Sequence, residues 1–144
     1  GGYDINNFDI KMQRKNGAKQ MAMILKALFS VKWFAKENKK ISAHTLQAQD
    51  EFFDMNVLFP KKSFMFLATL NNMINKYKTG KRNYPLLIGC GGFDIPMELE
   101  AVKQWKISEP NCRVVIFENA GHCVNMDVPR EFNETMEDFW TSAE

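Results

Sequence analysis

Apolar positions in the first half of the chain recur with the period of an α-helix. Residues 18–37 are predicted to form a helix with one main apolar stripe. That stripe consists of Met21, Ile24, Leu25, Leu28 and Val31. Residues 41–53 predict a second helix with Ser42 as its N-cap. A third helix is predicted over residues 60–77, because Pro60 is tolerated at a first helical position. This half of the chain is therefore expected to be all-helical.

After residue 85 the pattern changes to short apolar runs that alternate with helices. "LLIGC" at 86–90 and "CRVVIF" at 112–117 are continuous apolar runs, which are typical of strands covered on both faces. A helix is predicted between them over 97–107, and Pro129 opens a last one. The order strand, helix, strand, helix predicts an α/β fold class with two parallel strands.

Charge changes at the same place as the apolar pattern. The 144 residues carry a net charge of +2, but residues 1–84 hold 15 Lys or Arg against 6 Asp or Glu, and residues 85–144 hold 4 against 11. The basic residues are scattered along helical patterns without a nucleic-acid motif, so we expect a solvated face and no nucleic-acid partner. The chain is thus divided into a helical region, 1–83, and an α/β region, 84–144.

The glycine cluster "GCGGFD" at 89–94 invites comparison with cofactor-binding loops. A dinucleotide fingerprint needs glycine at its sixth position, where this chain has Asp94, an anion at the place a pyrophosphate would occupy. The loop also resembles the G-C-G-x-G segment of S-adenosylmethionine-dependent methyltransferases, but Phe93 replaces the third glycine. A methyltransferase fragment is one alternative for the function.

Two longer segments carry a more specific resemblance. "VVIFENAGHCVNMDVPREFNETMEDFW" at 114–140 resembles the C-terminal segment of α/β-hydrolases, and "LLIGCGGFDIPMELEAVKQW" at 86–105 resembles the strand-and-helix unit that precedes it. The resemblance implies a partial α/β-hydrolase core, its last two parallel strands with their helices, preceded by a helical cap or lid region at 1–83. It further implies that Asp94 is the acid and His122 the base of a catalytic triad.

The chemistry suits these two residues at the ends of adjacent parallel strands. A buried carboxylate that faces one imidazole nitrogen fixes the tautomer and stabilises the imidazolium that forms during catalysis. The alternative is structural: Asp94 caps the helix near Pro96, and His122 caps a turn. His44, the other histidine, is expected on a helix face.

The chain shows no nucleophile in the context that α/β-hydrolases use. They hold the nucleophilic serine in a G-x-S-x-G elbow. None of the five serines has that context: Ser30, Ser42, Ser63, Ser108, Ser142. Cys90 and Cys123 are expected to be inert thiols. We therefore expect this chain to be the C-terminal part of a serine-type hydrolase acting on an ester, amide or similar bond. The elbow would precede residue 1, and the chain alone would be inactive.

Further expectations concern partners and location. The substrate of the intact enzyme would be a small molecule, and no metal or organic cofactor is implied. Aromatic residues of the cap region would either line an apolar pocket or pack in its core: Trp33, Phe34, Phe52, Phe53, Phe64, Phe66. Three cysteines in no metal-binding spacing indicate free thiols and a cytoplasmic protein, and no apolar stretch is long enough for a membrane span.

The last expectation concerns association. Two strands leave exposed edges, so the chain should self-associate. A non-catalytic interaction domain derived from a hydrolase remains a further alternative.

Overall fold

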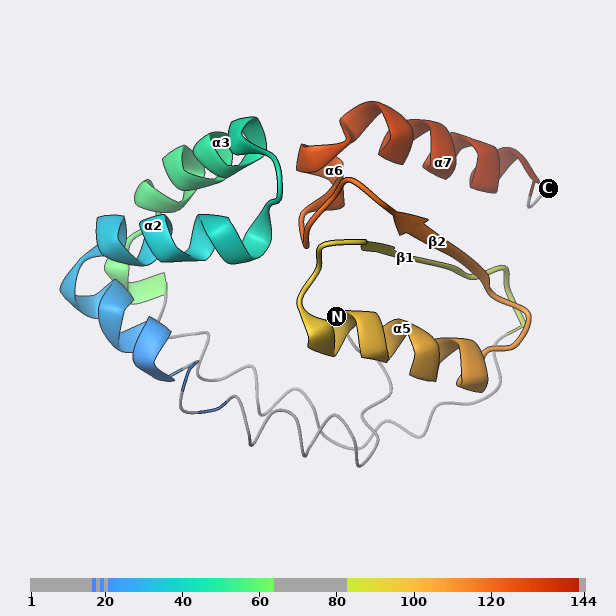
Figure 1. Ribbon diagram of the computed structural model, residues 1–144, viewed down its shortest axis with the longest axis horizontal. Coiled ribbons are helices and arrows are strands. Elements are labelled where there is room, and N and C mark those ends of the chain that lie inside the picture. The colour runs from blue at the N-terminus through green and yellow to red at the C-terminus, as the bar shows by residue number, and fades with distance from the viewer. Residues whose placement is uncertain (1–16, 18, 20, 64–82, 143–144) are drawn as a thin grey trace.

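The computed structural model describes residues 17, 19, 21–63 and 83–142. These residues form a mixed α/β structure in which a parallel two-stranded sheet follows a helical half (Figure 1). Besides helical residues 21–29, the elements are α2 (Val31–Ser42), α3 (Leu46–Val57), β1 (Leu87–Gly91), α5 (Pro96–Ser108), β2 (Arg113–Phe117), α6 (Val124–Asp127) and α7 (Pro129–Ser142). No helix within these ranges is long and apolar enough to cross a membrane.

The two strands lie in parallel register, as the alternation of strands and helices predicted. Leu87 pairs with Arg113 at one end, and Gly91 pairs with Phe117 at the other. α5 lies on one side of the sheet and α7 on the other (Figure 1). Both strands therefore end at the same edge of the sheet, where the loops that follow them meet.

The core of the α/β half is small. Phe117, at the end of β2, is 1% exposed and is the one large side chain that is fully buried among the described residues. It packs with Ala120 and Val124, and its ring contacts Phe132 of α7 at a centroid distance of 6.2 Å. This cluster anchors the loop after β2 to the sheet and to α7.

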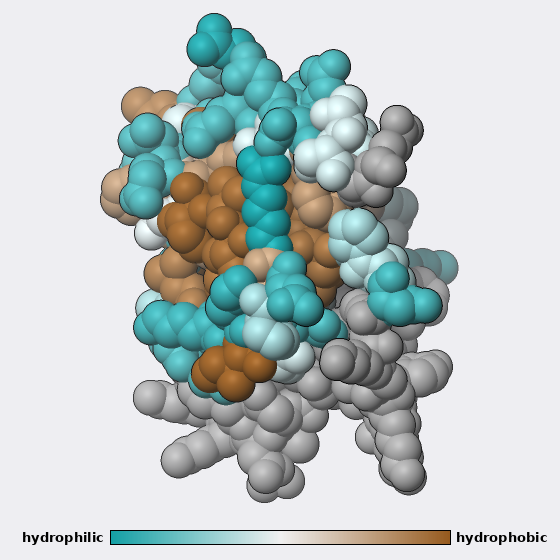
Figure 2. Space-filling view, turned by 90° about the vertical axis from the view of Figure 1, so that its right-hand side faces the viewer, coloured by the Kyte–Doolittle hydropathy of each residue, from teal (hydrophilic) through white to brown (hydrophobic). Residues whose placement is uncertain are grey.

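The sheet is less covered than its apolar strands predicted. Ile116 of β2 keeps 39% of its surface exposed, and Figure 2 shows apolar side chains gathered in the middle of the face seen from the right of Figure 1. The expectation of strands buried on both faces is met only in part, because Ile88, Cys90 and Phe117 are buried whereas Ile116 is not.

The helical half differs from its prediction at two serines. The single helix expected over 18–37 is broken at Ser30, whose side chain accepts a hydrogen bond from the backbone N–H of Trp33 as the N-cap of α2. Ser42 is not the N-cap of α3 but the buried last residue of α2. Thr45 caps α3 instead by accepting a hydrogen bond from Ala48 N.

Most other boundaries agree with the sequence pattern. Both strands lie within one residue of the predicted runs, and Pro96 and Pro129 are the first residues of α5 and α7. The short helix α6 was not predicted. Of the helix expected over 60–77, residues 61–63 are helical and the rest lies outside the described residues.

The loops after β1 and β2 touch through their backbones. The N–H groups of Gly92 and Phe93 donate to the carbonyls of Phe117 and Ala120, at 2.8 and 2.9 Å. A Cβ on Gly91 would lie 2.1 Å from the carbonyl oxygen of Gly121. The glycines are therefore required for the close approach of two backbones.

Replacing Gly91 by alanine should destabilise the protein by about 3 kcal/mol or more, because the atoms that would clash are backbone and cannot move aside. Gly17→Ala is the matched control: its Cβ would meet no atom within 4 Å, and its position is helical, so alanine should stabilise by roughly 0.5–1 kcal/mol. Urea unfolding followed by circular dichroism measures both. Equal midpoints for the two variants would contradict this account.

Candidate active site

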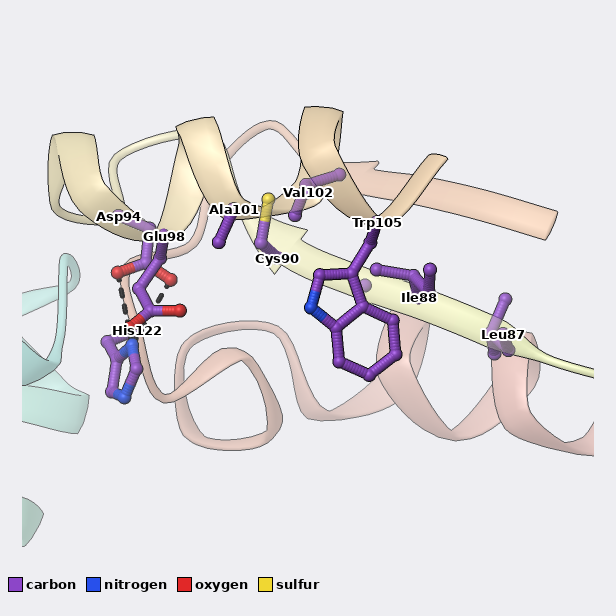
Figure 3. A pocket seen from close by; sticks show the side chains of 10 residues that line it. Leu87, Ile88, Cys90, Asp94, Glu98, Ala101, Val102, Trp105 and His122 are labelled. Atoms are coloured by element: carbon purple, nitrogen blue, oxygen red, sulfur yellow. Dashed lines mark hydrogen bonds and ion pairs between the residues drawn. The ribbon is translucent and has the colours of Figure 1, made fainter. Parts of the chain in front are cut away.

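The two strand ends bring Asp94 and His122 together, although 28 residues separate them. The Nδ1 atom of His122 lies 3.1 Å from Oδ1 and 3.2 Å from Oδ2 of Asp94 (Figure 3). The expected juxtaposition of these two residues is therefore present. It follows from the parallel register, because Gly91 and Phe117 are paired and each is followed by a short loop.

The pair has one buried and one accessible member. The Asp94 side chain is 3% exposed and that of His122 is 47% exposed. Asp94 Oδ1 also accepts a hydrogen bond from the N–H of Ile95 at 2.7 Å. Because a carboxylate can only accept, Nδ1 of His122 carries the proton, and neutral His122 has its free lone pair on Nε2.

The carboxylate also changes the proton affinity of the imidazole. The hydrogen bond to Asp94 raises the pKa of His122 above its ordinary value of 6.5, against the opposing effect of burial. The negative charges of Asp94 and Glu98 act in the same direction as the hydrogen bond. His122 is thus a stronger base than a free histidine.

The structural alternative for Asp94 finds no support in the geometry. The N-cap of α5 is Ile95, and no side chain caps this helix. The Asp94 carboxylate faces His122 and the adjacent N–H of Ile95 instead.

A cavity of about 350 Å³ adjoins the pair. One wall is β1 and another is the face of α5 that looks toward it, with Asp94, Glu98 and His122 at one end and Trp105, Ile88 and Leu87 at the other (Figure 3). The remaining lining residues are Gly89, Cys90, Ala101 and Val102. The cavity therefore has apolar side chains at one end and ionisable groups at the other.

The cysteines near the pair are held as thiols. Burial raises the pKa of Cys90, and the charges of Asp94 and Glu98 raise it further. Burial likewise raises the pKa of Cys123, together with the charge of Asp127. Because the thiolate is the nucleophilic form, neither residue is activated at neutral pH.

None of the five serines hydrogen-bonds His122 in the structure, and all five are described. Ser30 caps α2, and Ser42 is buried at the end of that helix. Ser108 and Ser142 donate to the carbonyls of Gln104 and Phe139, in the last turns of α5 and α7. Ser63 lies in a short helical stretch, residues 61–63.

His44 does not lie on a helix face, as was expected. It lies between α2 and α3, and its ring stacks on Phe93 with centroids 3.7 Å apart and planes inclined by 4°. Phe93 directly precedes Asp94. Sequence reasoning missed this contact because nothing in the pattern of residues 41–53 indicates a break at 43–45.

Of the aromatic residues expected in the helical region, the four that the structure describes do not line the cavity beside Asp94. Phe34 is buried and packs against Ala27, which agrees with the core-packing alternative, whereas Trp33 is about half exposed. Phe52 and Phe53 are half-buried, and Phe64 and Phe66 lie outside the described residues.

Among residues 17, 19, 21–63 and 83–142, no group of three or more His, Cys, Asp or Glu side chains is placed to hold a metal ion. Gly91 and Gly92, which prompted the comparison with methyltransferases, face the backbone of residues 118–121.

No protein-family model matches the chain, and no curated protein matches it significantly.

Asp94→Asn should lower the pKa of His122, because it removes the charge of the hydrogen-bond acceptor. Glu98→Gln should lower it less, because Glu98 acts only through space. Proton NMR titration of the imidazole signals measures both values, and assignment is simple because the chain has two histidines. An Asp94→Asn variant whose His122 titrates as in the unaltered chain would show that the two residues do not interact in solution.

Proposed function

We propose that this chain supplies the acid and the base of a serine-type triad of the α/β-hydrolase class, with Asp94 as the acid and His122 as the general base. One observation carries the proposal. Nδ1 of His122 faces a carboxylate that is almost fully buried, and the second ring nitrogen lies on the side of the ring away from Asp94 (Figure 3). This is the orientation that a triad requires.

In the proposed reaction a serine hydroxyl attacks the carbonyl of an ester, an amide or a similar bond in a small molecule. Nε2 of His122 takes the hydroxyl proton, and Asp94 stabilises the resulting imidazolium. His122 then returns this proton to the leaving group. Water repeats the sequence to release the acyl group, so both residues end in their starting protonation states. None of these steps needs a metal or an organic cofactor.

In this proposal the nucleophile lies outside these 144 residues, because no serine hydrogen-bonds His122 and neither Cys90 nor Cys123 is activated. Among the described residues β1 pairs with β2 alone, which supports the proposal. A further parallel strand beside β1 would end close to Asp94 and His122, because the carboxyl ends of parallel strands meet at one edge of a sheet. In this proposal α2 and α3 belong to a cap over the site.

The test is hydrolysis of p-nitrophenyl esters by the longer reading frame that contains this chain and a G-x-S-x-G segment. His122→Ala and Asp94→Asn should each lower kcat by about 10³-fold or more. Asp50→Asn, an exposed residue that pairs with Lys39, should leave the rate unchanged. The chain alone should show no hydrolysis above that of its His122→Ala variant. Full activity of the His122→Ala enzyme would overturn the proposal.

The missing nucleophile also favours a second candidate, a non-catalytic interaction domain on a hydrolase-like fold. It would be supported by a longer reading frame without a serine elbow, whose binding to a partner survives His122→Ala.

The chain alone should self-associate, because each strand of the described sheet pairs on one side only and Ile116 is accessible. Sedimentation velocity should show a weight-average coefficient that rises with protein concentration. Ile116→Lys should weaken the association, and Leu46→Lys, at an exposed position on α3, should not. A compact monomer at all concentrations would contradict this expectation.

A further inference from the structure

Asp127 is a buried carboxylate that joins the two halves of the described structure. It is 9% exposed and lies at the end of α6. Its Oδ1 accepts hydrogen bonds from Thr45 N at 2.7 Å and from Thr45 Oγ1 at 2.9 Å. Its Oδ2 accepts from Gly121 N at 2.8 Å, and His44 N lies within 3.0 Å of both oxygens. One carboxylate thus binds four donors from two distant parts of the chain.

These contacts flank His122 on both sides. Gly121, which precedes it, is held by Asp127, and the N–H of Cys123, which follows it, donates to the Ser42 carbonyl at 2.7 Å. We call residues 42–45 the α2–α3 corner. The corner therefore holds the backbone on both sides of the proposed base. Ser42 binds Cys123 directly, whereas Gly121 is held through Asp127.

Gly121 makes this contact possible. A Cβ at that position would lie 3.0 Å from His44 N and 3.2 Å from the carbonyl carbon of Ala43. We call residues 118–123, between β2 and α6, the histidine loop. This loop thus packs closely against the backbone of the corner. A larger residue would require this loop or the corner to shift by a few tenths of an ångström.

The corner also contacts the acid side of the site. The His44 ring stacks on Phe93, and Phe93 precedes Asp94. The N–H of Phe93 in turn donates to Ala120 in the histidine loop. The α2–α3 corner thus contacts a residue adjacent to each member of the proposed acid–base pair.

We infer that Asp127 is a positioning residue, which uses the α2–α3 corner to hold His122 in hydrogen-bonding position against Asp94. The inference rests on the proposed function, because it assigns a role to Asp127 only if Asp94 and His122 act as a pair. Asp127 itself hydrogen-bonds the corner and Gly121, not the imidazole.

The carboxylate is suited to this role because it stays charged. Burial alone would raise the pKa of Asp127, but hydrogen bonds from His44, Thr45 and Gly121 lower it below its ordinary value. Hydrogen bonds to a charged acceptor are stronger than those between neutral groups. Loss of the acceptor leaves buried N–H groups without a partner, which costs more than the bond itself contributes.

The test uses NMR titration of His122 in the whole chain. Asp127→Asn places an amide NH₂ where a carboxylate oxygen now accepts, so a donor faces a donor. The pKa of His122 should then fall by roughly half or more of the decrease that Asp94→Asn causes, because the hydrogen bond between His122 and Asp94 forms less often. Signals are assigned with His122→Gln.

Two further comparisons separate positioning from stability. Ser30→Ala removes the N-cap of α2, at a cost of about 1 kcal/mol, and should leave the His122 titration unchanged. Thr45→Val removes a hydroxyl that binds Asp127 and should lower the His122 pKa, whereas Thr45→Ser keeps that hydroxyl and should preserve it. If Asp127→Asn does not fold, the comparison of Thr45→Val with Thr45→Ser tests the positioning role instead.

Each result has one interpretation. If Asp127→Asn or Thr45→Val is destabilised but His122 titrates as before, Asp127 only stabilises the fold and the inference is wrong. If Asp94→Asn itself leaves the His122 titration unchanged, the acid–base pair fails, and with it the proposed function. The positioning role is supported if the pKa of His122 falls in Asp94→Asn and also in Asp127→Asn or Thr45→Val. In that case the pKa should not change in Ser30→Ala.

Discussion

The backbone contact between the loops after β1 and β2 is the constraint on which the site depends. Gly91 and Gly92 allow this approach, because a side chain on either would meet backbone atoms of residues 118–121 at less than 3 Å. Parallel register brings both strand ends to one edge, and the close contact then sets the distance between Asp94 and His122. Backbone packing therefore does more to bring Asp94 and His122 together than the attraction between their side chains. That attraction is modest, because about half of the His122 side chain is in solvent.

Polar contacts from the α2–α3 corner support this backbone contact between the two loops. The apolar core of the α/β half is small, with Phe117 at its centre, so apolar burial alone holds the histidine loop on one side only. Hydrogen bonds from the α2–α3 corner hold the other side through Asp127 and Ser42. Residues of the α2–α3 corner, which lie far from His122 in the sequence, thus contribute to its geometry. Three of the four buried polar or charged residues of the described structure take part in these contacts: Ser42, Asp94, Asp127.

The sequence predicted both strands, most helix boundaries and the proximity of Asp94 and His122, the last through the resemblance of residues 86–140. Continuous apolar runs marked the strands, and prolines marked the starts of α5 and α7. The order of strands and helices then implied parallel pairing, which brings Asp94 and His122 to one edge. The α2–α3 corner could not be predicted in this way. Ser42 and Thr45 are both good N-cap residues, and the choice between them depends on Asp127, which lies 82 residues from Thr45. The role of His44 was missed for the same reason.

The two sets of contacts around His122 differ in the length of chain that must close to form them. Asp94 and His122 are 28 residues apart and can meet once β1 and β2 pair, whereas Asp127 and His44 are 83 residues apart. Loop-closure entropy and folding time both increase with such separations. We therefore expect Asp94 and His122 to meet during folding before the corner docks, so that the loop carrying His122 reaches its final position last.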